Sequence, residues 1–242
     1  MCGRYVLKRE DLEALLRTMG VTDVREFVSR YNIAPSTMIP AIRTGREGTR
    51  KAVALQWGLV PHWSKDAKDG ARLANARADG VAKKPAFRHA FRNRRCVVPA
   101  SGFYEWQTIG KGKYPWYFQL KDGQPFVFAG LWESWRSEDG IELQTCSLIT
   151  TEPNDVVRPL HDRMPVILRD AAIDTWLDPR VTEPEKLEPL LAPTPPELMT
   201  ATPVSPRVNS VKNEGAECLE RFEHPPAVAA PAQDQQLGLG LD

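Results

Sequence analysis

The chain has 242 residues, 42% of them hydrophobic and 26% charged, which is a composition typical of a globular protein. No apolar run approaches the roughly 18 residues of a membrane span, and the N-terminus lacks the apolar core of a secretory signal, so we expect a cytoplasmic protein without a membrane partner. The cysteines and histidines show no short-spaced pairs, which argues for reduced thiols and against a structural zinc site.

The net charge of +1 conceals a basic segment. Between residues 60 and 95, ten Lys/Arg oppose three Asp, which gives +7 there and leaves −6 for the rest of the chain. Such a segment predicts a surface that binds polyanions, although an isolated basic stretch is as often a solvated face.

Hydrophobic periodicity predicts the elements in chain order. A helix is expected over residues 9–19, ended by Gly20, and an extended segment or loop over 31–42. A strand over 51–61 precedes loops and short helices at 64–93. Further strands are expected over 96–106, entering a tight turn at Gly102, and over 114–120, 125–135, 143–150 and 164–168. Helices follow near 170–177 and 184–191.

This order predicts an α+β fold, with a curved or barrel-like antiparallel β core flanked by helices in one domain over residues 1–222. The sequence has no βαβα alternation, no GxGxxG and no Walker loop, which disfavours nucleotide-binding α/β folds. Residues 223–242 are rich in Pro, Ala, Gln and Gly and contain no Lys or Arg, so we expect a disordered tail.

The second residue is the most informative feature. Small residues at this position generally permit removal of the initiator Met1, which would leave Cys2 with a free α-amine beside its thiol. The reference pKa values, about 7.7–8.0 for the amine and about 8.5 for the thiol, make both nucleophiles accessible near neutral pH. A 1,2-aminothiol condenses with an aldehyde to a Schiff base and then closes a thiazolidine ring. Gly3 would let a bulky substrate approach.

Several later segments place polar residues in apolar, strand-like sequence: ANARAD, VVPASGFYEW, LITTEPN and PLHDRMPVIL. A carboxylate such as Glu105, between aromatic neighbours, could have a raised pKa and act as acid or base. Taken singly, Glu105 reads as a partly exposed strand residue and His161 as part of a surface turn.

From MCGRY through YNIAPS, WGLVPHW, NAR, RCVVPASGFYEW, ITTEPN and HDRMPVIL, the chain resembles the SOS-response-associated peptidase (SRAP) family of abasic-site-processing proteins. The resemblance extends more weakly to about residue 222. One departure is Asp79, where the NAR motif of the family more usually continues with Glu.

The resemblance implies a cofactor-free and metal-free monomer, associated with the nucleoid, that crosslinks to abasic sites in single-stranded DNA. It implies that Cys2 forms the crosslink, Asn75 orients the amine or sugar, Glu105 shuttles protons and His161 opens the deoxyribose ring. It also implies that the residue preceding Cys2 is removed by the same site. The implied DNA contacts are Arg4, Pro40, Trp63, Arg77, Thr150 and Arg163.

Two alternatives remain at this point. A glutamine amidotransferase with an N-terminal nucleophile also begins Met-Cys-Gly, but the HTRWAT-like and Asn-Gly segments of such enzymes are missing from the sequence. A noncatalytic single-strand-binding module would share the basic segment and Trp63.

The end of the tail carries a further motif. Gln236, Leu237, Leu239 and Leu241 fit the Q-L-x-L-x-L pattern that resembles bacterial sliding-clamp-binding peptides, in which Gln supplies hydrogen bonds and the leucines fill apolar pockets. A chance low-complexity end is the alternative.

Overall fold

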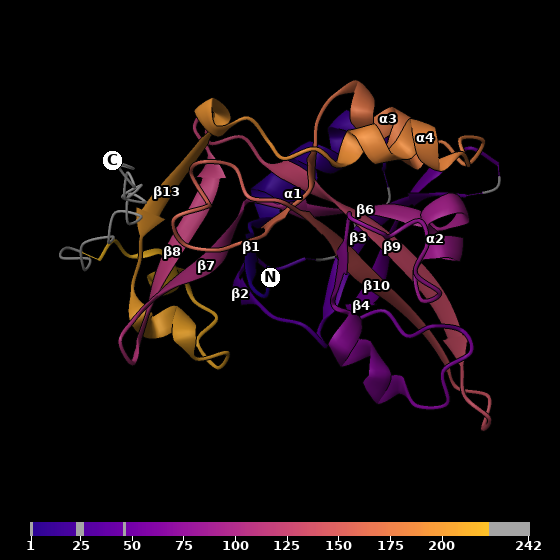
Figure 1. The fold of residues 1–242 in the computed structure, drawn as a ribbon, viewed down its shortest axis with the longest axis horizontal. Helices are drawn as coiled ribbons and strands as arrows, with labels where there is room; N and C mark the ends of the chain where they lie inside the picture. Colours follow the sequence, from indigo (N-terminus) through magenta and orange to yellow (C-terminus); the bar gives the residue numbers. More distant parts are fainter. Residues whose placement is uncertain (1, 23–26, 46, 223–242) are drawn as a thin grey trace, which may run out of the picture.

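Two β-sheets organise the chain, and its N-terminal residues run between them (Figure 1). The computed structural model describes residues 2–22, 27–45 and 47–222. The sequence-based expectation of an α+β fold with a barrel-like β core is confirmed. The clamp-binding motif and the rest of residues 223–242 lie outside the described residues, so the domain boundary at 222 stays a prediction.

The smaller sheet is antiparallel and has the strand order β13-β8-β7-β1-β2. A turn at Gly110, whose φ of +57° favours glycine, joins β7 to β8. The strands are β1 (Tyr5–Leu7), β2 (Arg30–Ile33), β7 (Gly102–Ile109), β8 (Gly112–Leu120) and β13 (Met199–Pro203).

The larger sheet closes on itself. Strand β10 pairs with β9 on one side and β4 on the other, so β4, β3, β6, β9 and β10 form a barrel. Short strands β5 and β11 add to β10, and β12 adds to β9. The strands are β3 (Met38–Thr44), β4 (Arg50–Trp57), β5 (Asn75–Arg77), β6 (Arg95–Ala100), β9 (Phe126–Arg136), β10 (Glu142–Thr151), β11 (Met164–Pro165) and β12 (Ile167–Leu168).

The helices are short and lie around the sheets (Figure 1). They are α1 (Arg9–Thr18), α2 (Arg88–Asn93), α3 (Ala171–Leu177), α4 (Pro184–Leu187) and the 3-10 helices η1 (Ala67–Leu73), η2 (Glu188–Leu191), η3 (Pro196–Leu198), η4 (Pro206–Asn209) and η5 (Ala216–Leu219). Helix α1 forms as predicted and buries Leu12 and Leu16. Across the described ranges, no helix combines the length and apolar character needed to cross a bilayer.

Three sequence-based expectations differ from the structure. The segment 31–42, expected as an extended segment or loop, is extended over much of its length but contributes to two paired strands, β2 and β3. The single strand expected over 96–106 is two, because the chain leaves the barrel at Ser101 and enters the smaller sheet at Gly102, where a Cβ would lie 2.4 Å from the Tyr117 ring. The helix expected over 184–191 divides into α4 and η2, since Pro189 has no N–H to continue the hydrogen-bond ladder.

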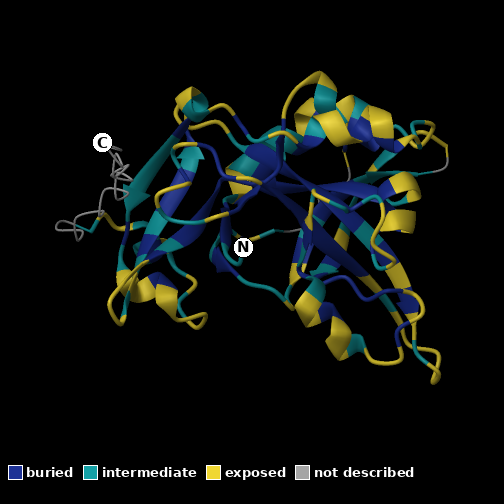
Figure 2. Ribbon diagram, in the orientation of Figure 1, coloured by how far each residue is buried: buried dark blue, intermediate teal, exposed yellow. Residues whose placement is uncertain are grey.

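Aromatic side chains join the two sheets into one core. Tyr5 of the smaller sheet contacts Trp57 and Phe128 of the barrel edge-on, with ring centroids 5.6 and 5.8 Å apart. Buried residues follow the central strands of both sheets, and exposed residues gather on the helices and hairpin tips (Figure 2). The strand that follows Cys2 is therefore fixed by the packing between the sheets.

Candidate active site

Backbone pairing places Cys2 beside β7 and β5. The Arg4 carbonyl accepts the Tyr104 N–H at 3.0 Å, and Tyr5 is paired with Phe103, so the N-terminal residues run along β7. From the other side, Asn75 Nδ2 donates to the Cys2 carbonyl oxygen at 2.9 Å. Cys2 is thus held from both sheets.

The Cys2 thiol is buried, and its electrostatic surroundings hold it in the protonated form. Burial raises the pKa of the Cys2 thiol far above its ordinary value, and the nearby carboxylate of Glu105 raises this pKa further. Because the thiolate is the nucleophilic form, the thiol alone is a weak nucleophile at neutral pH. Chemistry at this residue therefore requires either a second nucleophile or a proton acceptor.

Glu105 and His161 form an acid–base pair near Cys2. Glu105, on β7, is only 3% exposed, and burial raises its pKa to about 7. His161 Nε2 lies 3.8 Å from Glu105 Oε2, and burial lowers the pKa of His161. Near neutral pH the carboxyl group therefore populates both protonation states beside a neutral imidazole, which suits proton transfer.

The protonated nitrogen of His161 follows from its backbone neighbour. The Arg163 N–H donates to Nδ1 at 3.0 Å, so Nδ1 is the acceptor and the proton of the neutral ring belongs on Nε2, facing Glu105. Asp162 Oδ1 also lies 3.0 Å from Nδ1 and can stabilise the ring when both nitrogens are protonated.

Strand register gathers four of the predicted site residues on one face. Thr150 of β10 is paired with Arg77 of β5 and with Pro165 of β11, and Asn75 lies two residues before Arg77. Since alternate residues of a strand share a face, Asn75, Arg77, Thr150 and Arg163 form one polar row.

Part of this polar row is left available to a ligand. Among the described residues, Asn75 Oδ1, Thr150 Oγ1 and Arg163 Nε are buried without a hydrogen-bond partner. Because burying an unpaired polar atom is costly, such atoms are suited to receive a polar ligand.

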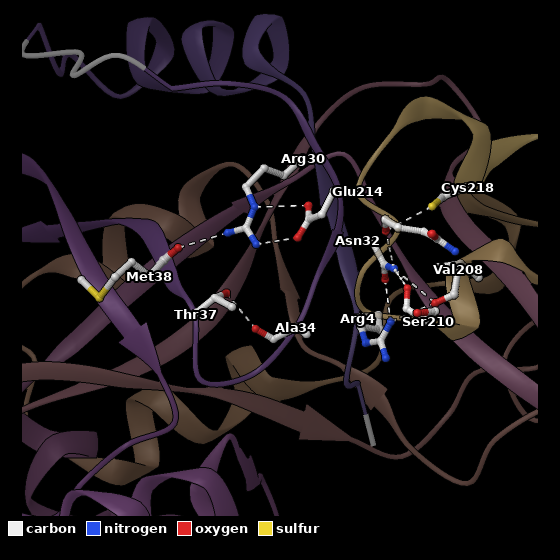
Figure 3. A network of polar contacts seen from close by, with 11 residues as sticks. Arg4, Arg30, Asn32, Ala34, Thr37, Met38, Val208, Ser210, Glu214 and Cys218 are labelled. Atoms are coloured by element: carbon white, nitrogen blue, oxygen red, sulfur yellow. Dashed lines mark hydrogen bonds and ion pairs between the residues drawn. The ribbon is translucent and has the colours of Figure 1, made fainter.

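Arg4 belongs to a network that links the two ends of the described chain (Figure 3). Its Nη1 donates to Asn32 Oδ1 at 2.7 Å and to the Val208 carbonyl at 2.9 Å. Asn32 is fully buried, and its Nδ2 donates to the carbonyls of Val208, Ser210 and Asn213. The side chain of Arg4 is therefore tied to the C-terminal segment. Sequence reasoning missed Asn32, because YNIAPS gives no sign that this side chain is buried.

The two residues predicted to contact bases line different cavities. Trp63 is 59% exposed in the loop after β4, where it lines a small cavity with Arg72. Pro40, on β3, lines an apolar cavity of about 330 Å³ between α1 and strands β3 and β4. Neither lining includes Cys2, so their role in binding bases stays a prediction.

Two arginines at the end of the basic segment 60–95 have structural partners, whereas its other Lys and Arg residues are exposed. Arg95 is buried and donates to five backbone carbonyls, which tie α2 and α3 to the barrel. Arg94 pairs with the buried carboxylate of Glu133. The sequence-based interpretation of the segment as one polyanion-binding face is wrong for these two arginines, because buried partners hold them in structural roles. No group of three or more His, Cys, Asp or Glu within the described ranges could hold a metal ion.

Comparisons with known proteins identify the family and the fold of the chain. The family described as SOS response associated peptidase (SRAP) matches residues 1–211. The chain is 42% identical to the abasic site processing protein YoaM of Bacillus subtilis, over 93% of this chain and 100% of that protein. It is 30% identical to the abasic site processing protein YedK of Escherichia coli, over 91% and 99%. A solved structure from Bacteroides thetaiotaomicron has a TM-score of 0.81 and 26% identity, covering 91% of this chain and 100% of that one.

Proposed function

The chain belongs to the SOS response associated peptidase (SRAP) family, and on that premise we propose that it is a DNA damage response protein that captures abasic sites in single-stranded DNA through Cys2. The observation that carries the proposal is the position of Cys2, held by Asn75 and placed beside an acid–base pair whose carboxyl group titrates near pH 7. The family and the names of two relatives supply the substrate class.

The covalent step needs only the protein and the lesion. After Met1 is removed, the α-amine of Cys2 adds to the aldehyde carbon of the ring-opened sugar, and loss of one water gives an imine. The thiol sulfur then adds to the imine carbon, its proton passes to the nitrogen, and a five-membered thiazolidine closes. The balance is the loss of one water, with no oxidant, metal or organic cofactor.

Each polar group around Cys2 has a separate role in the reaction. Glu105 gives a proton to the departing hydroxyl of the carbinolamine and takes one back on reversal, which is suited to a pKa near 7. His161 assists in opening the sugar ring, and Asn75 holds the Cys2 backbone. The same groups would hydrolyse the bond preceding Cys2 and would give the site some lyase character.

The DNA strand would follow the polar row outward from Cys2. Arg77, Thr150 and Arg163 lie on one face there, and unpaired buried atoms of Thr150 and Arg163 are placed for phosphate or sugar oxygens. Arg4 and its neighbours would bind on the other side of the lesion. Trp63 and Pro40 would contact bases, and the protein would act as a monomer on exposed single strands.

Replacing Cys2 with alanine is expected to abolish a denaturant-stable product with an abasic oligonucleotide, because both covalent bonds involve this residue. The measurement is a denaturing gel of protein mixed with abasic and intact strands. Noncovalent binding of the intact strand serves as the control for folding and is expected to persist. A shifted band of equal intensity in Cys2→Ala would contradict the proposal.

The same gel tests the first alternative, and a separate glutaminase assay tests the second. A noncatalytic single-strand-binding module would bind both strands equally and give no shifted band. An amidotransferase would release ammonia from glutamine and would lose that activity in Cys2→Ala.

We further infer a tether to the replication sliding clamp. The sequence carries the proposal, since Gln236, Leu237, Leu239 and Leu241 fit the clamp-binding pattern; the last described residues, Arg221 and Phe222, pair with Val204 and Pro203 beside the smaller sheet. Deleting residues 236–242 is expected to abolish clamp pull-down while leaving crosslinking on free oligonucleotides unchanged. Replacing Leu237 and Leu239 with alanine should have the same effect. Clamp pull-down by both the deletion and the alanine variant would contradict the proposed tether.

A further inference from the structure

One carboxylate lies between two of the arginines on the polar row. Asp79 Oδ1 and Oδ2 accept hydrogen bonds from Arg77 Nε and Nη2 at 3.1 and 2.9 Å. Asp79 Oδ1 also lies 3.1 Å from Arg163 Nη1. Two guanidinium groups from different segments thus share one acceptor.

Arg163 does not depend on Asp79 for its position. Its Nη2 donates to the Thr150 carbonyl oxygen at 2.5 Å, and its side chain is 11% exposed. The backbone of Asp79 is itself placed by β10, since the preceding Ala78 N–H donates to the same Thr150 oxygen at 2.8 Å. The side chain of Arg77, by contrast, is 55% exposed, and its Nε and Nη2 donate to the Asp79 carboxylate. The Asp79 carboxylate therefore neutralises the charges of Arg77 and Arg163, but Arg163 does not need it for its orientation.

The other acids of the basic segment have local roles. Asp66 accepts the Lys68 N–H at the start of η1, and Asp69 accepts the Ser64 hydroxyl. Asp79 is the acid of this segment that is directed at the arginines of the polar row.

Carboxylate and phosphate oxygens are equivalent acceptors for a guanidinium fork. We propose that Asp79 occupies the position of a DNA phosphate in the free protein and lowers its affinity for undamaged single strands. The inference rests on the proposed function. An intact strand must displace the carboxylate and gains only noncovalent contacts, whereas an abasic strand is retained by its bond to Cys2. Asp79 thereby makes retention depend on the lesion, and it is a specificity-determining residue.

The test is Asp79→Asn, which keeps the shape of the side chain and removes its charge. Fluorescence anisotropy with an intact oligothymidylate is expected to show binding that is a few-fold tighter at low salt. If one further phosphate is contacted, the slope of log K against log[salt] should steepen by about 0.7. The crosslinking rate at saturating protein on an abasic strand is expected to stay unchanged, so discrimination between the two strands falls.

Two controls isolate the effect. Glu142→Gln makes the same change in net charge at an exposed position at the start of β10 and is expected to leave affinity unchanged. In a double-mutant cycle, Asp79→Asn should give a smaller gain in affinity when Arg77 is already alanine, because only Arg163 is then released.

Three outcomes would overturn the inference. Weaker binding in Asp79→Asn would show that the carboxylate orients the arginines. An equal gain in affinity in Glu142→Gln would show that the effect depends only on net charge. If the unmodified protein does not bind the intact strand, there is no phosphate site for Asp79 to occupy. If the anisotropy results are as predicted but no crosslink forms, only the proposal of covalent capture is contradicted.

Discussion

A protein that keeps any residue before Cys2 is expected to form no denaturant-stable crosslink, even though every side chain of the site is present. The thiol cannot begin the reaction, because burial and the Glu105 carboxylate raise its pKa and keep it protonated. The α-amine must therefore attack first, and an acylated nitrogen is not a nucleophile. The measurement is crosslink yield on an abasic oligonucleotide, paired with intact-mass spectrometry of the same sample to establish the terminus.

Matched variants distinguish the role of the α-amine from that of the thiol. The same N-terminal extension followed by a protease site should restore full yield after cleavage to Cys2. Cys2→Ser retains the amine but cannot close a thiazolidine, so its adduct should require borohydride to survive denaturation. Full crosslinking by a protein whose mass shows the preceding residue still attached would contradict the aminothiol mechanism.

The local elements of the fold could be predicted because they depend on local pattern. Hydrophobic spacing identifies α1, and the strands expected over 125–135 and 143–150 correspond to β9 and β10, which are joined by a turn where Gly140 adopts a φ of +85°. The strand pair that closes the barrel could not be predicted, because the parallel pairing of β10 with β4 joins residues almost ninety positions apart, such as Thr145 and Gln56. Nothing in either segment encodes that partner choice.

For the candidate site, the sequence predicts residues but not their geometry. Cys2 was evident from its position in the chain, whereas Glu105 and His161 were assigned roles only through the family resemblance. Their proximity depends on β7 and on the loop before β11, which lie in different parts of the fold. The roles of Asn32 and Asp79 depend on burial and on contacts with distant segments, so no spacing rule could have identified them.

Glu105→Gln is expected to lower the crosslinking rate by about 10²- to 10⁴-fold, the usual contribution of a positioned acid–base group, and to reduce noncovalent affinity far less. Burial raises the pKa of Glu105 to about 7, so this carboxyl group is protonated below that pH and can donate to the departing hydroxyl. The α-amine needs the opposite condition, because only its unprotonated form attacks. The unmodified protein should therefore show a rate that rises as the amine deprotonates and falls as Glu105 ionises. Single-turnover rates measured from pH 5.5 to 9 should lose the inflection near pH 7 in the variant.

Stability provides the control for this substitution. Because burial raises the pKa of Glu105 above that of the unfolded chain, ionisation of this group opposes folding. The penalty is absent when the pH is below the pKa of this group in the unfolded chain. It grows as the pH rises toward 7 and reaches its full size above pH 7. Glu105→Gln removes this penalty, so its melting temperature at pH 8 is expected to equal or exceed that of the unmodified protein. A slow variant that is also less stable at pH 8 would point to a structural role for Glu105, and an inflection retained near pH 7 would assign that titration to another group.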